Sequence, residues 1–307
     1  MRHGRWILGA LAASLAAPVV WFFARPQPEP VTEDLAPGLR YQRLVRDDPR
    51  QILHVVTIDL AAGARFVVTA GDPGEELPLR AETTSAFART TDVDVALNGD
   101  FFSPWHSRGP LDYYPHVGDP VAPTGFAAAS GVSYGRPRVV PGATLFVTCD
   151  GAPTFSRPAD LCEAISGQPI LVAGEMRPSP SESRARHPRT AICLDETRQR
   201  FLGLVIDGRQ PGYSVGARWD ELGEALLALG CHDAINLDGG GSSTLVLRRG
   251  GEHVVASMPI HTRIPGRERP IANHLGVRLA PPTPTRAHAP RGRGLSRLGS
   301  ASEGALP

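Results

Sequence analysis

The stretch of the chain best suited to chemistry runs from Ala234 to Leu247 and is centred on Asp238. Three adjacent glycines follow Asp238, and they indicate a backbone path that a Cβ atom would block. Successive N–H groups in such a bend can form an anion-binding concavity, to which the hydroxyls of Ser242 and Ser243 would add donors. This combination predicts a site that holds a phosphate ester for hydrolysis. The alternative is a glycine-rich hairpin turn with a solvated carboxylate, because glycine clusters are common turn signals.

Polar groups also occur at the ends of three other expected strands. They are Asn98 with Asp100, Arg189 with Thr190, and Asp207 with Arg209. Taken alone, Asn-Gly and Asp-Gly pairs are turn signals, and Arg189 is equally compatible with a surface ion pair. Together with Asp238, these groups indicate one edge of a sheet where loops gather, which is a common place for a site on a rigid scaffold.

The segment between Pro104 and Gly142 is rich in Pro, Gly, Tyr and His, and we expect a long loop with short strands there. Its aromatic and histidine side chains are Trp105, His106, Tyr113, Tyr114 and His116. They either line a sugar-binding surface or pack beneath the loop without a function.

The elements that must position these groups are mainly strands. Apolar or alternating runs bounded by turn residues predict strands at residues 52–60, 65–70, 93–97, 144–148, 168–173, 191–194, 201–206 and 274–279. Helices are expected at 79–90 and from about Asp220, which would cap the second helix, with Gly230 after its end. Because strands outnumber helices without regular alternation, we expect an α+β fold: a single domain with a mixed, largely antiparallel central sheet flanked by helices.

The charge of the chain excludes several classes of protein. The formal net charge is +1, so nothing indicates a nucleic-acid partner. All 32 basic residues are arginines, which excludes a Schiff-base lysine and a Walker-type phosphate loop. Any cationic contact to an anion must therefore come from Arg or His, and Arg can bind an oxyanion through two N–H groups at once.

The four cysteines form no Cys-x-x-Cys pair, so a zinc knuckle is not expected. Cys149 and Cys162 flank a loop and are expected to form a disulfide outside the cytoplasm. Cys193 and Cys231 lie in apolar segments and are expected as buried thiols. A divalent cation at the carboxylates is an open alternative, because hard cations prefer oxygen ligands, but no diagnostic ligand spacing identifies a metal.

The two ends of the chain differ in composition from the domain at 35–280. Residues 1–24 combine basic residues with an apolar run and predict a membrane anchor, or alternatively a cleaved signal peptide. Either would place the domain outside the cytoplasm, in the periplasm or at the cell surface. Residues 25–34 are expected to be a Pro-rich linker, and residues 281–307 a disordered tail.

Four motifs, in this order and spacing, resemble the phosphodiester glycosidase family over roughly residues 35–280. They are Asn98-Gly99-Asp100-Phe101-Phe102, Pro188-Arg189-Thr190-Ala191-Ile192, Val205-Ile206-Asp207-Gly208-Arg209, and Asn236-Leu237-Asp238-Gly239-Gly240-Gly241-Ser242-Ser243. The last motif is long and specific, whereas the others carry weight mainly through their order. The resemblance implies hydrolysis of a sugar-1-phosphodiester such as a GlcNAc-1-phosphodiester, which releases the sugar and a phosphate monoester.

The resemblance also implies roles for individual residues. Expected catalytic residues are Asp238, with Asp207 as second choice, and Arg189 and His187 for charge neutralisation. Expected substrate-binding residues are Asn98, Asp100, Thr190, Arg209, Asn236, Gly239, Gly240, Gly241, Ser242 and Ser243. Asp100 stands where the family often has a glycine. A second hypothesis is a non-catalytic envelope protein that binds a phosphosugar polymer or exopolysaccharide in the same pocket.

Overall fold

The fold is that of a computed structural model, which describes residues 25–136, 140, 142–179 and 184–280. The expected anchor at 1–24 and the expected tail at 281–307 lie outside the described residues. Among the described residues, no helix is both long and apolar enough to cross a membrane.

The largest sheet has eight strands, and every neighbouring pair in it is antiparallel. In spatial order they are β1 (Val31–Ala36), β2 (Leu39–Asp47), β3 (Arg50–Asp59), β19 (Arg200–Ile206), β18 (Arg189–Leu194), β20 (Asp233–Asn236), β16 (Gln168–Val172) and β17 (Glu175–Met176). The sheet therefore begins within the segment expected to be a linker, because β1 pairs with β2.

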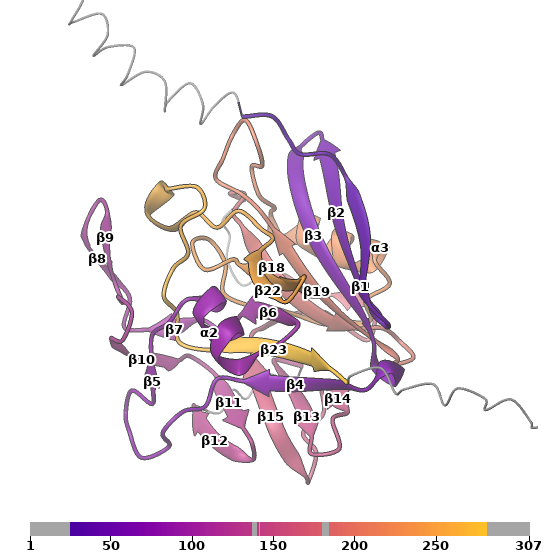
Figure 1. Cartoon of the computed structure of the whole chain (residues 1–307), viewed down its shortest axis with the longest axis vertical. Helices are drawn as coiled ribbons and strands as arrows, with labels where there is room; N and C mark the ends of the chain where they lie inside the picture. The colour runs from indigo at the N-terminus through magenta and orange to yellow at the C-terminus, as the bar shows by residue number, and fades with distance from the viewer. Residues whose placement is uncertain (1–24, 137–139, 141, 180–183, 281–307) are drawn as a thin grey trace, which may run out of the picture.

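A second sheet has five strands and crosses the middle of the molecule (Figure 1). In spatial order they are β22 (Glu252–Val255), β21 (Leu245–Arg249), β6 (Val95–Asn98), β23 (His274–Leu279) and β4 (Ala64–Val68). The sequence Val-Ala-Leu-Asn of β6 suits its central place in this sheet, where all four residues are buried.

The remaining strands form smaller antiparallel groups. A third sheet has the order β12 (Val132–Gly135), β11 (Phe126–Ala129), β15 (Leu161–Ser166), β13 (Thr144–Thr148) and β14 (Pro153–Thr154). A three-stranded sheet joins β5 (Leu79–Arg80), β10 (Pro120–Pro123) and β7 (Phe102–Ser103), and β8 (His106–Gly109) pairs with β9 (Asp112–Tyr114). The β8–β9 hairpin projects from one side of the molecule (Figure 1).

The main core lies where the sheets face one another. Even-numbered residues of β3 such as Val56 and Ile58 join this core together with Leu97 of β6 and Leu275 of β23. Odd-numbered residues of β3, including Val55, belong to a second core on the opposite face of the same sheet. A strand buried on both faces alternates between two cores, which explains its nearly continuous apolar sequence.

Two α-helices lie on the outer faces of these sheets. Helix α3 (Trp219–Ala228) covers the second core, and helix α2 (Thr84–Thr91) covers the far face of the five-stranded sheet through Phe87 and Ala88. The N-cap of α3 is Arg218 rather than Asp220, and α2 starts after Thr83, whose hydroxyl accepts from the Ala86 N–H.

The expected α+β architecture, with a central sheet flanked by helices, is wrong. The described residues form several antiparallel sheets that pack mainly on one another, with two α-helices and two short 3₁₀ turns, Leu60–Ala62 and His261–Arg263. The difference arises because the segment between Pro104 and Gly142, expected as a long loop with short strands, contributes five strands, β8 to β12, to three separate sheets.

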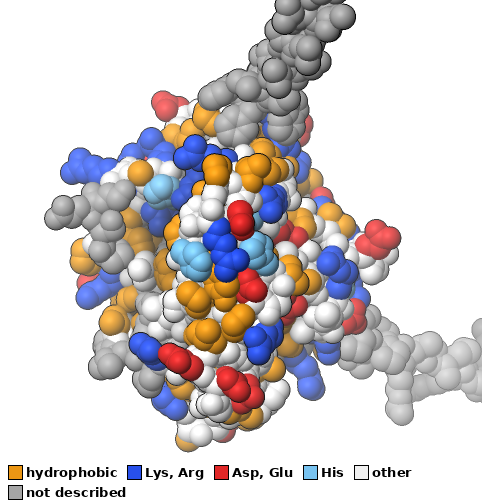
Figure 2. All heavy atoms as spheres, turned by 90° about the vertical axis from the view of Figure 1, so that its left-hand side faces the viewer, with side chains coloured by type: hydrophobic (Ala, Val, Ile, Leu, Met, Phe, Trp, Pro, Cys, Tyr) orange, Lys and Arg blue, Asp and Glu red, His pale blue; other side chains and the backbone are white. Residues whose placement is uncertain are grey.

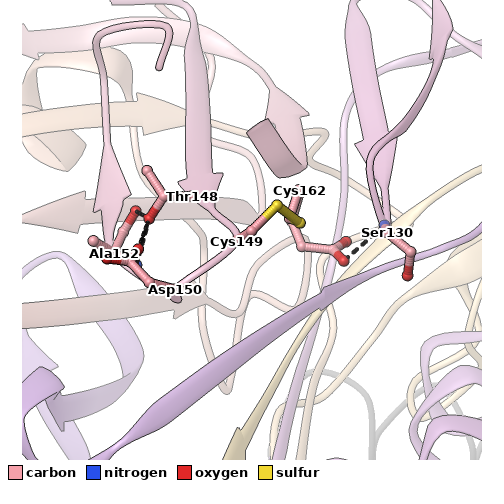
Figure 3. The surroundings of a disulfide bond; sticks show 7 residues. Ser130, Thr148, Cys149, Asp150, Ala152 and Cys162 are labelled. Atoms are coloured by element: carbon pink, nitrogen blue, oxygen red, sulfur yellow. Dashed lines mark hydrogen bonds between the residues drawn. A yellow bond between two sulfur atoms is a disulfide. The ribbon is translucent and has the colours of Figure 1, made fainter. Parts of the chain in front are cut away.

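Both cysteine pairs form disulfides. The expected Cys149–Cys162 bridge joins the residue after β13 to β15, beside the turn at Ser130 (Figure 3). Glu163, next to this bridge, accepts from the N–H groups of Ser130 and Val68, both at 2.9 Å. The expectation of free thiols at Cys193 and Cys231 is wrong, because their Cα atoms are 5.7 Å apart and the two residues form a second bridge.

Candidate active site

The loops at the ends of β6, β18, β19 and β20 meet at a cavity of about 900 Å³. Its polar lining comes from His187, Arg189, Arg209, Asp238, Thr262, Arg263 and Arg269. Its apolar lining includes Phe101, Phe102, Trp105, Tyr113, Pro211 and Ile260. Arg189 and Asp238, distant in sequence, therefore face the same space. Figure 2 shows the side of the molecule that carries the β8–β9 hairpin, where arginine and histidine side chains gather at the surface.

Asp238 is the sole carboxylate in this lining among the residues that the structure describes. Its side chain is 15% exposed, and one oxygen accepts from the Ser242 hydroxyl at 2.6 Å. The other oxygen accepts from the Gly239 N–H at 2.8 Å, and the Arg269 guanidinium lies 4.0 Å away. Burial raises the pKa of Asp238, against the opposing effects of Arg269 and Ser242. The carboxylate is thus held in one orientation with part of its surface open to the cavity.

The three glycines after Asp238 bring other groups close to the backbone. A Cβ atom at Gly239 would lie 2.8 Å from the Pro188 carbonyl oxygen, and one at Gly241 would lie 2.6 Å from Arg269. Gly240 has φ +65°, and a Cβ there would lie 2.9 Å from a guanidinium nitrogen of Arg209. The glycines therefore allow two arginines to approach the loop that carries the carboxylate.

The expected row of free amides is not formed at this loop. The Gly239 N–H donates to the Asp238 carboxylate, and the Gly240 N–H donates to the Pro188 carbonyl at 2.9 Å. Positive charge at the cavity therefore comes from guanidinium groups, and these two amides hold the loop in place.

Asn98 and Thr190 lie beneath the cavity and do not line it. Asn98 is fully buried, and its amide donates to the Asp238 carbonyl at 2.7 Å. Its side-chain oxygen accepts from the Thr190 hydroxyl at 2.7 Å and from the Thr244 N–H at 3.1 Å. This amide ties β6, β18 and the start of β21 to the backbone of Asp238, so its position suits a structural connection.

Asp207 is also buried and lies outside the cavity lining. Its carboxylate contacts His54 Nε2 at 2.9 Å and accepts from the Met258 N–H at 2.8 Å. The other ring nitrogen of His54 contacts the Tyr41 hydroxyl at 2.8 Å. Asp207 therefore fixes the strand end that precedes Arg209, whose own φ is +59°.

Of the other expected substrate-binding residues, Gly239 and Gly240 line the cavity, whereas Asp100, Asn236, Ser242 and Ser243 are buried around it without lining it. The Asp100 carboxylate accepts from the Phe101 N–H at 2.8 Å and the Gly125 N–H at 2.6 Å. The Asn236 amide donates to the Leu237 carbonyl, and the buried Ser243 hydroxyl has no hydrogen-bond partner within the described part of the chain. These side chains shape the loops around the cavity.

Of the four arginines that line the cavity, Arg189 and Arg269 are partly buried and Arg209 and Arg263 are exposed. Arg189 donates to the Ala217 carbonyl at 3.1 Å, and Arg209 lies 3.3 Å from His187 Nδ1. Within the described residues, no carboxylate comes within 4.0 Å of Arg189, Arg209 or Arg263. Burial lowers the pKa of Arg189 and Arg209, yet a guanidinium remains protonated in proteins. Unpaired positive charge of this kind favours an anionic ligand.

His187 lies between these arginines and is expected to be neutral. Burial, followed by the charges of Arg209 and Arg189, lowers the pKa of His187. Its Nδ1 faces the Arg209 guanidinium, which can only donate, so the ring accepts there. His187 therefore orients Arg209 more than it adds charge.

Three polar lining residues are not among the candidates from the sequence: Thr262, Arg263 and Arg269. All three belong to the loop between β22 and β23, away from the strand ends that carry the other polar groups. The signal in the sequence is the density of arginines at 263–269, at a Pro-Gly turn. The aromatic residues Trp105 and Tyr113 do line the cavity, and their rings meet edge to face at 5.7 Å.

The donor set gives no indication of a metal. Among the residues that the structure describes, no three His, Cys, Asp or Glu side chains are grouped as metal ligands.

Comparisons with known proteins agree with these motifs. Residues 91–278 match the model of the phosphodiester glycosidase family, whereas no curated protein sequence matches significantly. The fold resembles the catalytic domain of zebrafish N-acetylglucosamine-1-phosphodiester alpha-N-acetylglucosaminidase, auto-inhibited by a pro-peptide, with a TM-score of 0.55. The identity is 19%, over 84% of this chain and 86% of that chain.

A hypothetical protein from Synechocystis also has a similar fold, with a TM-score of 0.50 and 17% identity, over 82% of this chain and 64% of that chain. The family match spans more than half of the sequence and includes every lining residue of the cavity. The chain therefore belongs to the phosphodiester glycosidase family.

Proposed function

We propose that the protein hydrolyses a sugar-1-phosphodiester, with a GlcNAc-1-phosphodiester as the first substrate to test. The observation that carries the proposal is the cavity in which Asp238 faces Arg189 and Arg209. The zebrafish enzyme of similar fold is named for a GlcNAc-1-phosphodiester, which supports the choice of sugar.

The chemistry suits this set of residues. A phosphate on the anomeric carbon is a good leaving group, so it needs charge neutralisation more than protonation. Arg189 and Arg209 would neutralise the phosphate while the bond between the anomeric carbon and oxygen breaks. Water would add to the anomeric carbon and transfer a proton to the Asp238 carboxylate, or the carboxylate would stabilise the oxocarbenium-like centre. The products are the free sugar and a phosphate monoester.

The deciding experiment is a screen of sugar-1-phosphate diesters in which released sugar and phosphate monoester are both measured. Breakage at the anomeric carbon gives those two products, whereas attack at phosphorus would give a sugar phosphate. Asp238→Asn should lower turnover by at least about a thousandfold, because the carboxylate would be lost from the transition state. Asp34→Asn, which changes an exposed ion pair with Arg40 outside the cavity, is the matched control. Near-full activity of a folded Asp238→Asn variant would contradict the assignment.

One observation favours a second function, the binding of a phosphosugar polymer without turnover. Most glycosidases use two carboxylates, and Asp238 is alone in the lining within the described part of the chain. A binding protein would retain the diester with measurable affinity and release no sugar, so the same screen separates the two functions.

We also propose that the domain works outside the cytoplasm. Disulfides persist in oxidising compartments, and the two bridges of this domain support such a location. Membrane attachment through residues 1–24 is part of the same proposal, and fractionation of cells that express the full chain would test it.

A further inference from the structure

The charge of the cavity exceeds what a single phosphodiester can balance. Four lining residues are arginines and one is a carboxylate, within the described part of the chain. A phosphodiester brings one negative charge. Asp238 pairs with Arg269, which leaves the guanidinium groups of Arg189, Arg209 and Arg263 to face the ligand. A ligand with one negative charge cannot balance three positive charges.

Arg263 is exposed, as is Arg209, and the loop that carries Arg263 is held by several hydrogen bonds. The loop is held by hydrogen bonds from the His261 N–H to the Arg267 carbonyl at 2.9 Å and from the Gly266 N–H to the Pro259 carbonyl at 2.8 Å. Arg267 also donates to the Thr262 hydroxyl at 2.9 Å. These hydrogen bonds therefore hold the backbone of Arg263 in place at the cavity.

The backbone of Arg263 is itself unusual. Thr262 has φ +52° and Arg263 has φ +62°, so two consecutive residues with side chains occupy the left-handed region. Such strained residues persist where the surrounding structure enforces them, often at ligand sites. Arg209 has φ +59°, so both arginines at this side of the cavity are presented from left-handed positions.

Arg209 and Arg269 both lie against the loop that carries Asp238, because Cβ atoms at Gly240 and Gly241 would lie 2.9 Å and 2.6 Å from their guanidinium nitrogens. In the described part of the chain, Arg269 comes within 4.0 Å of the Asp238 carboxylate and Arg263 does not, although Arg263 lines the same cavity. If Asp238 acts at the anomeric carbon and Arg209 at the phosphate, Arg263 is the cavity arginine that remains for a group on the alcohol released with the phosphate.

We infer that the cavity accepts a sugar-1-phosphodiester with a second acidic group on the aglycone, and that Arg263, with Arg209, binds this group. The inference rests on the proposed function for the identity of the first anion. It narrows the substrate class to diesters whose aglycone is itself anionic, such as an acidic sugar or the next phosphate of a sugar phosphate polymer.

The test compares two GlcNAc-1-phosphodiesters of nearly the same shape. One has a carboxymethyl aglycone and the other has a carbamoylmethyl aglycone, so they differ by one negative charge. We expect the wild-type protein to show a KM about fivefold lower for the acidic diester, the size expected for one partly exposed ion pair. The preference should shrink as NaCl is raised, because salt screens exposed charges. A third diester with a 2-phosphonooxyethyl aglycone distinguishes phosphate from carboxylate as the second anion.

Arg263→Gln should remove the preference while leaving KM for the neutral diester within about twofold. Arg263→Asn is the second variant, since Asn tolerates a left-handed backbone better than most residues. Arg40→Gln lowers the net charge equally but lies outside the cavity, so it should leave the preference unchanged.

The same pairs of diesters are also compared by calorimetric binding, which requires no turnover. If wild-type protein turns over no diester, the proposed function fails, and the charge preference in binding then decides the inference alone. Equal KM and equal affinity for the acidic and neutral diesters would overturn it, and so would a preference that survives in both Arg263 variants.

Discussion

Gly240 shows how a single residue without a side chain can control an arginine. Its φ of +65° favours glycine, and a Cβ there would lie 2.9 Å from the Arg209 guanidinium. Gly240→Ala should therefore displace Arg209 and lower kcat/KM for a phosphodiester by at least about tenfold, which corresponds to the loss of roughly 1.4 kcal/mol of transition-state stabilisation. Steady-state kinetics on the purified variant would measure this loss.

Gly250 provides a matched control, because its φ is +58° and a Cβ there would meet nothing within 4 Å. Gly250→Ala should carry a similar backbone strain of about 1–2 kcal/mol without any change in activity. If both variants lose activity equally, strain and not the contact with Arg209 explains the role of Gly240.

Arg269 should set the pH at which Asp238 becomes protonated. Burial raises the pKa of Asp238, and the positive charge of Arg269 acts in the opposite direction. Arg269→Gln removes that charge, so the pKa of Asp238 should rise further. Because the carboxylate is the proposed active form, the acid limb of the kcat/KM profile should then move to higher pH. Arg40→Gln is the control, and the acid limb should not move in that variant. An acid limb that also stays in place in Arg269→Gln would contradict this role of Arg269.

At the scale of residues, the sequence predicted those site residues that lie directly at the end of a strand. Asp238, Arg189 and Arg209 each follow or begin a strand, and all three line the cavity. Arg263 and Arg269 were missed, since they lie on a loop whose path depends on left-handed residues that no local pattern indicates. The expectation of free glycine amides fails at Gly239 and Gly240, because the first donates to the neighbouring Asp238 carboxylate and the second to the distant Pro188 carbonyl.

At the scale of elements, Asn98 joins three strands to the loop that carries Asp238. Asn98→Ala would leave the Asp238 carbonyl, the Thr190 hydroxyl and the Thr244 N–H without this partner. Each unsatisfied buried group costs about 1–3 kcal/mol, so we expect a loss of roughly 3–5 kcal/mol in the free energy of unfolding. Urea denaturation followed by circular dichroism would measure it.

Ser243→Ala is the matched control for that variant, since the buried Ser243 hydroxyl has no hydrogen-bond partner among the residues that the structure describes. Removing the hydroxyl should leave stability unchanged or slightly higher. A small effect of Asn98→Ala, comparable with that of Ser243→Ala, would mean that the connection through Asn98 contributes little.

The sequence predicted long strands better than short ones. The expected strands at 52–60, 201–206 and 274–279 correspond to β3, β19 and β23, because each is a buried apolar run. Between residues 102 and 135, strands of two to four residues are too short to show a period. Their pairing depends on partners elsewhere in the chain, so the extra sheets and the all-β character could not be read locally.

At the scale of the whole molecule, the disulfides should contribute differently to stability. The Cys149–Cys162 bridge closes 13 residues and the Cys193–Cys231 bridge closes 38. Loop-closure entropy predicts contributions of about 3 and about 4 kcal/mol, respectively. Replacing each pair by alanine should lower the free energy of unfolding by about these amounts, measured by urea denaturation against wild type. The reverse ranking would show that contacts around the shorter bridge outweigh chain entropy.

The position of β23 has a consequence for how the protein is made. β23 pairs with β4 and β6, which the ribosome produces much earlier, since His274 follows Asn98 by most of the chain. At about 5–20 residues per second, the apolar edges of β4 and β6 wait roughly 10–35 s for their partner. Unpaired apolar strand edges are prone to aggregate, so efficient production should depend on a chaperone that binds the nascent chain until β23 is made.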